Sequence, residues 1–172
     1  MSQRPLPDVE ETPYADDMPM LGLGTWENTD PEACANAVET AIGMGYRHVD
    51  TAQAYGNEAD VGRGVAAAAV PREELFLATK VGADHLGRDG VVESTEGSLS
   101  KLGVDYVDLL YVHWPVRTYD PVETLAAFDE LHDRGLIDRV GVSNFGPDRL
   151  DEAIARTDAP VFANQVEVHP FL

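Results

Sequence analysis

The sequence predicts an α/β fold, a (β/α)8 barrel of parallel strands of which the first six β–α units are present and the last two are missing. Short apolar runs alternate with amphipathic stretches, the pattern of parallel strands joined by crossover helices. Two runs, LFLATK and VDLLYVH, lack clean apolar–polar alternation, as expected of strands covered on both faces. Marker residues at the run ends recur about every 28 residues, close to the roughly 31 per unit of a 250-residue barrel.

Six segments are expected to form the strands: residues 20–24, 46–50, 75–80, 107–113, 139–143 and 162–168. They are rich in β-branched, aromatic and other apolar residues, which suit buried strands. Strict alternation of strands and helices predicts a parallel sheet with right-handed crossovers, so all six strands run in one direction and their carboxyl ends meet on one face. Functional residues are therefore expected on that face.

Five helices are expected between the strands, beginning near residues 31, 58, 89, 121 and 147. Asp30, Asn57 and Asp120 precede three of them, where a side-chain oxygen can accept hydrogen bonds from the free amides of the first turn. Two glycines within the second helix, Gly62 and Gly64, are expected to allow close packing against a neighbour.

The whole chain, residues 1–172, is expected to form the N-terminal part of a single barrel domain, with residues 1–17 as a leader and hairpin region and the hairpin itself at about residues 12–21. An incomplete sheet leaves two strand edges unpaired and the interior uncovered, which favours aggregation. This chain is therefore expected to be poorly soluble or oligomeric by itself and to catalyse no reduction, and the completed barrel is expected to be monomeric.

The charge balance limits the classes of partner. The chain carries 31 acidic and 12 basic residues, a formal net charge of −19, so nucleic acid and anionic membrane surfaces are not expected as partners. One cysteine, Cys34, rules out an intramolecular disulfide, and no long apolar run suggests a signal peptide or membrane span. The expected location is the cytoplasm.

The acidic excess also suggests a salt-rich environment. Charges of one sign repel at low salt, whereas at 1 M salt the Debye length of about 3 Å screens them. We therefore expect a halophilic host with an acidic proteome; the alternative is an acidic protein of a mesophile.

Polar residues follow the predicted strands where their carboxyl ends converge. Asp50, Lys80 and His113 each end an apolar run, and Tyr55 follows Asp50 by five residues. A buried lysine needs a carboxylate to keep its charge, and a nearby ammonium is expected to lower the pKa of a tyrosine. With a histidine to orient a carbonyl oxygen, the set would donate a proton to an oxygen that gains negative charge, as carbonyl reduction requires.

The motifs around these residues resemble one enzyme family. The segments LGLGTW, GYRHVDTAQAYGNEADVG, LFLATK, LGVDYVDLLYVHWP, GVSNF and NQVEVHPFL are similar, in order and spacing, to those of the aldo-keto reductases, most closely the prokaryotic 2,5-diketo-D-gluconate reductase-like members. The resemblance covers residues 18–172. It implies NADPH-dependent reduction of aldehydes and ketones, with NADH as the less common cofactor.

The resemblance also implies a role for each matching residue. Tyr55 corresponds to the family's proton donor, Asp50 and Lys80 to the residues that tune it, and His113 to the residue that orients the carbonyl. The implied cofactor-binding residues are Thr25 and Asp50 at the nicotinamide ribose and Ser143, Asn144 and Gln165 at the carboxamide. The implied walls of the substrate pocket are Trp26 and Trp114.

The chain also departs from the family's pattern. The last two β–α units, with the platform beneath the nicotinamide and the basic residues that bind the 2′-phosphate, are absent from these 172 residues. The alternative function is therefore a non-catalytic remnant, or a half-barrel that needs a partner chain. No metal site is expected, because His169 and Glu167 have no third ligand nearby in the sequence.

Overall fold

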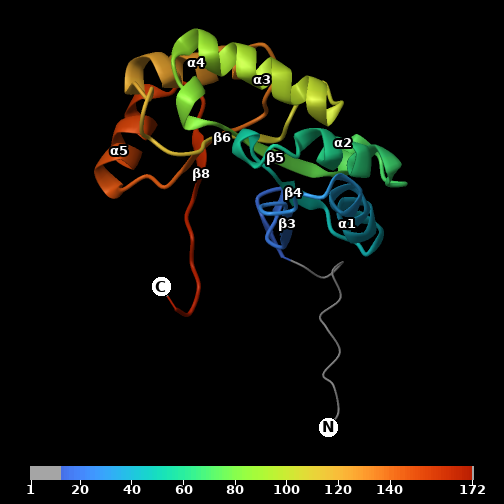
Figure 1. The fold of residues 1–172 in the computed structure, drawn as a ribbon. Coiled ribbons are helices and arrows are strands. Elements are labelled where there is room, and N and C mark those ends of the chain that lie inside the picture. Colours follow the sequence, from blue (N-terminus) through green and yellow to red (C-terminus); the bar gives the residue numbers. More distant parts are fainter. Residues whose placement is uncertain (1–12, 172) are drawn as a thin grey trace.

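The computed structural model describes residues 13–171 of the chain. Six parallel strands form one curled sheet in the order β3-β4-β5-β6-β7-β8, so each strand pairs with its neighbours in the sequence. The strands are β3 (Gly22–Gly24), β4 (His48–Asp50), β5 (Phe76–Val81), β6 (Leu109–Val112), β7 (Val140–Ser143) and β8 (Val161–Gln165). Figure 1 shows the helices gathered on the outer side of the sheet. The predicted incomplete barrel is confirmed.

The five helices lie close to their expected positions. They are α1 (Pro31–Gly43), α2 (Glu58–Ala67), α3 (Arg88–Leu102), α4 (Pro121–Asp133) and α5 (Pro147–Arg156). Asp30 caps α1 by accepting the Ala33 amide at 2.8 Å, and Asp120 caps α4 by accepting the amides of Val122 and Glu123. The prediction that the Asn57 side chain caps α2 is wrong, because this side chain makes no capping hydrogen bond. None of the helices in the described part of the chain has the length and apolar character to cross a bilayer.

The core has two parts, one on each face of the sheet. The outer part packs the helices against β4 to β7 and includes Val38, Leu110 and Phe128, all fully buried. The inner part lies on the concave face, where Phe76, Ala78, Leu109 and Tyr111 form a separate cluster. Every residue of β5, β6 and β7 is buried, which explains their lack of apolar–polar alternation in the sequence.

A short hairpin lies at the amino-terminal end of the concave face. Strands β1 (Tyr14–Ala15) and β2 (Met18–Pro19) pair antiparallel, and Asp17 between them forms an ion pair with Arg139, just before β7. The Arg139 guanidinium lies 5.6 Å from the centre of the Phe76 ring. The hairpin predicted at about residues 12–21 is thus seen at residues 14–19. Residues 1–12 lie outside the described part.

The last predicted strand, 162–168, is too long by three residues. Strand β8 ends at Gln165, and Val166, Val168 and Phe171 are 52%, 83% and 95% exposed. Figure 1 shows this segment running away from the sheet toward the carboxyl terminus. Strand β7 ends at Ser143, and Asn144 turns away with a φ of 64°, so residues beyond Gln165 have no partner strand on that side.

Gly62 and Gly64 bring α2 into contact with its two neighbours. A Cβ atom on Gly62 would lie 2.5 Å from the carbonyl oxygen of Leu102 in α3, and one on Gly64 would lie 2.5 Å from that of Ala35 in α1. Both obstacles are main-chain atoms, which cannot move aside as a flexible side chain can. The close packing expected from the sequence is confirmed.

We predict that Gly62→Ala and Gly64→Ala each destabilise the chain by about 1–3 kcal/mol, although alanine is the better helix former. The matched control is Gly97→Ala in α3, where a new Cβ meets nothing within 4 Å. That variant is expected to stabilise the chain by about 1 kcal/mol or less. Urea denaturation measures all three; equal effects at the three positions would contradict the packing argument.

Candidate active site

The four predicted acid–base residues meet at the carboxyl ends of the strands. Asp50 ends β4, Lys80 lies in β5, His113 follows β6, and Tyr55 belongs to the short 3-10 turn η2 (Gln53–Tyr55). Lys80 Nζ forms an ion pair with Asp50 Oδ1, donates to the carbonyl oxygen of Thr51 at 2.9 Å and lies 3.5 Å from the Tyr55 hydroxyl. The rings of Tyr55 and His113 meet edge to face, with centroids 5.8 Å apart.

Lys80 is the most strongly buried charge of this group, with 1% of its side chain exposed. Burial lowers its pKa because the ammonium loses its hydration, and contact with the Asp50 carboxylate opposes that shift. The alternative to this pair would be an isolated buried charge, which is costly. The pair therefore keeps a cation beneath the Tyr55 hydroxyl.

The prediction that the pKa of Tyr55 is lowered is wrong. Burial, together with the charge of Asp50, raises the pKa of Tyr55 to about 12. The short contacts of Lys80 Nζ are with Asp50 and Thr51, whereas the distance from Nζ to the Tyr55 hydroxyl oxygen is at the limit of a hydrogen bond. The phenol thus keeps its proton at neutral pH and is a donor until another oxygen takes the proton.

The surroundings of His113 favour the neutral form of its imidazole. Burial lowers its pKa, the Lys80 charge lowers it further, and the Asp50 charge acts in the opposite sense. A neutral imidazole has one N–H to donate, which can orient an oxygen without competing for the proton of Tyr55. The carbonyl oxygen of His113 accepts the Asn144 side-chain amide at 3.0 Å, which ties the end of β6 to the loop after β7.

A second polar group closes the same face. Ser143 ends β7, Asn144 follows it, and Gln165 ends β8. The Ser143 hydroxyl donates to the main-chain oxygen of Gln165 at 2.9 Å, and Asn144 Nδ2 donates to Ser143 Oγ at 3.0 Å. Gln165 Nε2 donates to Asp50 Oδ2 at 3.0 Å and so joins the two polar groups.

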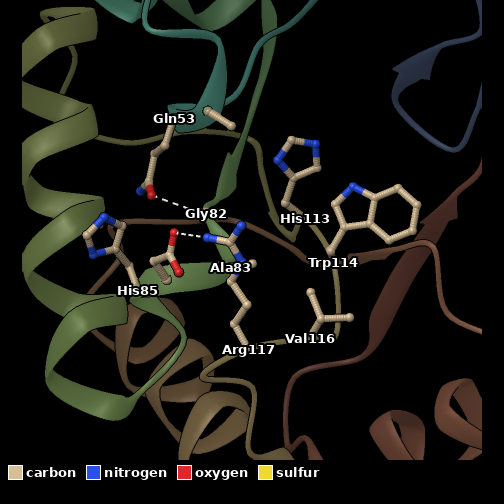
Figure 2. A pocket seen from close by; sticks show the side chains of 10 residues that line it. Gln53, Gly82, Ala83, His85, His113, Trp114, Val116 and Arg117 are labelled. Carbon is tan, nitrogen blue, oxygen red and sulfur yellow. Dashed lines mark hydrogen bonds and ion pairs between the residues drawn. The ribbon is translucent and has the colours of Figure 1, made fainter.

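Two cavities meet at this face, and they share Ala54, His113 and Trp114. One, of about 510 Å³, contains Tyr55 and the Ser143–Asn144–Gln165 group. The other, of about 400 Å³, is drawn in Figure 2, between the loops after β5 and β6. Its polar residues are Gln53, which accepts the Gly82 amide at 2.9 Å, His85, and the ion pair of Asp84 with Arg117. Tyr55 and His113 thus lie where a carbonyl group between the two cavities would be reached.

The predicted wall residues and Thr25 have different surroundings. Trp26 and Trp114 both line the larger cavity and are 71% and 50% exposed. Thr25 is buried, and its hydroxyl donates to Thr51 Oγ1 at 2.9 Å. This bond connects the end of β3 to the residue that follows β4. Contact of Thr25 with a cofactor ribose stays a prediction.

Asn57, which the sequence predicts as a helix cap, has a different role that its local sequence does not reveal. Asn57 is 3% exposed; its Nδ2 donates to the carbonyl oxygens of Thr25 and Asn28, and its Oδ1 accepts the Thr51 hydroxyl. It therefore fastens the loop that carries Trp26 to the end of β4. The available signal was its place two residues after Tyr55, but a cap and a buried anchor have the same local sequence.

Backbone strain gathers on the same face. Glu27, Arg117 and Asn144 follow three of the strands, and all have positive φ, between 56° and 64°. Non-glycine residues in this conformation cost energy and cluster at functional sites. Within residues 13–171 no group of three or more His, Cys, Asp or Glu side chains converges.

Comparison with known proteins identifies related chains. The family model described as "Aldo/keto reductase family" matches residues 20–172. An aldo-keto reductase of Mycolicibacterium smegmatis is 44% identical over 156 residues, which cover 90% of this chain and 56% of that protein. The 9,11-endoperoxide prostaglandin H2 reductase of Trypanosoma cruzi is 42% identical over 153 residues, 89% of this chain and 54% of that one.

Solved structures give the same result. A crystal structure assigned as a 2,5-diketo-D-gluconic acid reductase B has a TM-score of 0.85 and 41% identity, covering 88% of this chain and 54% of that one. The aldo-keto reductase of Bombyx mori, solved in complex with NADP, has a TM-score of 0.82 and 37% identity, covering 88% and 55%. The chain thus spans little more than half the length of the relatives it matches.

We predict that Lys80→Met raises the pKa of His113, because removing the ammonium removes a charge that lowers it. NMR titration of the five histidines measures this, with His113→Asn assigning the signal. Lys101→Met changes the only other lysine, which pairs with Glu58, and is expected to leave the His113 pKa unchanged. A folded Lys80→Met chain with an unshifted His113 would contradict the proposed electrostatics.

Proposed function

Because the chain belongs to the aldo/keto reductase family, we propose that it carries the acid–base site of an NAD(P)H-dependent reductase that converts aldehydes and ketones to alcohols. The observation that supports this most strongly is the convergence of Asp50, Tyr55, Lys80 and His113 beside a cavity lined by two amides and a hydroxyl. We propose NADPH as the cofactor, with NADH as the alternative, and a small carbonyl compound as the substrate.

The residues of the larger cavity fit the nicotinamide end of such a cofactor. Ser143, Asn144 and Gln165 place a hydroxyl and two amides together at the cavity, a set suited to a carboxamide. No lysine or arginine is among the described residues that line this cavity, so the groups that would hold phosphates are not found there. When bound, the reduced cofactor supplies the hydride that reduces the carbonyl carbon.

The protein's own groups then handle the oxygen. The neutral imidazole of His113 donates a hydrogen bond that orients the carbonyl oxygen. As that oxygen gains negative charge, the Tyr55 hydroxyl gives it a proton. The Lys80 ammonium stabilises the phenolate left on Tyr55, and Asp50 holds the ammonium in place. Trp26 and Trp114 flank the substrate, whose remaining atoms would extend into the smaller cavity.

A second candidate is a half-barrel that acts only with a partner chain, or a remnant without catalysis. The observation that favours it is that β3 and β8 each pair along one edge only. The two candidates differ in one measurement, the oxidation of NADPH by the purified chain with a panel of aldehydes. Turnover by a monomer supports the first candidate, and turnover that requires a second chain supports the second.

In the completed barrel, we predict that Tyr55→Phe lowers kcat by about 10²–10⁴-fold, since the proton donor is lost while the ring is retained. The matched control is Tyr46→Phe, a tyrosine outside both cavities, which is expected to keep near-normal turnover. Cofactor affinity, followed by tryptophan fluorescence, is expected to change little in either variant. Normal turnover in Tyr55→Phe would show that another group donates the proton.

A salt-rich cytoplasm is part of the same proposal. It is supported by the net charge of −19 and by the use of only two lysines among 12 basic residues. We predict that the free energy of unfolding rises from millimolar to molar KCl as repulsion is screened, and that the circular dichroism spectrum loses helical signal at the low end. A spectrum and stability that do not depend on KCl would remove this part of the proposal.

A further inference from the structure

The hydrogen bond from Gln165 Nε2 to Asp50 Oδ2 joins two strands with three others between them. It is 3.0 Å long and links residues 115 positions apart in the sequence. The other oxygen of Asp50, Oδ1, is bound to Lys80, so each carboxylate oxygen has one strong side-chain partner. An ionised carboxylate can only accept hydrogen bonds, so the amide must present its nitrogen to Asp50. Asp50 therefore decides which way the Gln165 amide points.

The orientation of the neighbouring amide is decided in the same way. Asn144 Nδ2 donates to the main-chain oxygen of His113, which is also an acceptor only, and to Ser143 Oγ. The Ser143 hydroxyl donates its own hydrogen bond to the main-chain oxygen of Gln165. Nearly all the donors of this group are thus used within the protein.

Acceptors are what remain for a ligand. The hydrogen bonds that orient the two amides use their nitrogen atoms. Among the described residues, these bonds leave Asn144 Oδ1 and Gln165 Oε1 without a donor. Both residues line the 510 Å³ cavity. A ligand with an –NH₂ group satisfies such acceptors, whereas a carboxylate brings only lone pairs against them. It also meets the negative charges of Asp50 and of Glu167, which lines the cavity.

We propose that Asp50, acting through Gln165, is a specificity-determining residue that makes this cavity select a carboxamide over a carboxylate on the pyridine ring of the cofactor. The inference rests on the proposed function, since it concerns the cofactor of that site. It adds a second role to Asp50, which holds the Lys80 ammonium with one oxygen and orients the cofactor-recognising amide with the other.

The test compares two nucleotides that differ in one group, NADP⁺ and its acid analogue, nicotinic acid adenine dinucleotide phosphate. Binding to the full 172-residue chain is measured by calorimetry and by fluorescence of Trp26 and Trp114, both at the cavity. We expect the amide to bind at least about tenfold more tightly, the order of loss when hydrogen-bonding groups are left unpaired. Equal affinities would overturn the inference.

Variants separate the path through Gln165 from the charge of Asp50 alone. Gln165→Met keeps length and volume but removes both amide groups, and we expect it to lower the preference to about threefold or less by weakening NADP⁺ binding. The control is Asn164→Met on the same strand, whose amide is bound to the main chain of Phe145; it is expected to keep the preference. A preference that survives Gln165→Met would show that the charges of Asp50 and Glu167 repel the acid directly, and would overturn the role of Gln165.

The orientation itself has a readout that needs no nucleotide. In NMR spectra of the wild-type chain, one Nε2 proton of Gln165 is expected to be shifted and protected from exchange by its bond to Asp50. Asp50→Asn removes the acceptor-only partner, so the shift and protection are expected to be lost while Asn164 signals stay in place. A Gln165 amide with free-amide behaviour in the wild type would overturn the inference.

Failure of the inference and failure of the proposed function are distinguishable. Absence of binding by either nucleotide contradicts the cofactor site and the inference together. Binding of both nucleotides without preference contradicts the inference alone and leaves the cofactor site supported.

Discussion

The buried ammonium of Lys80 is the constraint on which the rest of the site depends. A charge with 1% of its side chain exposed needs a close counter-charge, and Asp50 supplies it from the neighbouring strand. The pairing of β4 with β5 puts Asp50 opposite Ala78, two residues before Lys80, so the carboxylate and the ammonium meet at the carboxyl end of the sheet. The register of these two strands therefore has an electrostatic as well as an apolar component.

The same pair sets the protonation of its neighbours. Burial and the negative charge of Asp50 keep Tyr55 protonated, while burial and the positive charge of Lys80 keep His113 neutral. Two neutral groups, one a proton donor and one a hydrogen-bond donor, thus lie over an ion pair. The charges of the site are therefore held by the ion pair of Asp50 and Lys80, while the proton is proposed to be transferred by Tyr55.

Rigidity elsewhere supports the strained loops of this face. Glu27, Arg117 and Asn144 hold unfavourable backbone conformations after β3, β6 and β7, and every residue of the last two strands is buried. Asn57 fastens one of these loops with three hydrogen bonds, and Asn144 fastens another through the His113 carbonyl. Close packing of α2 through Gly62 and Gly64 adds a well-packed frame behind them.

The sequence by itself determined the elements, their parallel order and the meeting of Asp50, Tyr55, Lys80 and His113 on one face. Periodicity, helix caps and strand spacing are local properties, and the carboxyl ends of parallel strands must converge. The pattern was also specific enough to indicate the family before any comparison. The resemblance proposed a cofactor role for Gln165, but no local signal pointed to its bond with Asp50.

Tertiary structure alone decided the contacts and charges that depend on distant segments. Asn57 has the sequence of a cap but is buried as an anchor, because the loop carrying Trp26 packs over it. The pKa of Tyr55 is raised rather than lowered because of its burial, which no local pattern reports, and the charge of Asp50. Gln165 reaches Asp50 across the curl of the sheet, and Val166 to Phe171 leave it, because strand pairing depends on where neighbouring strands end.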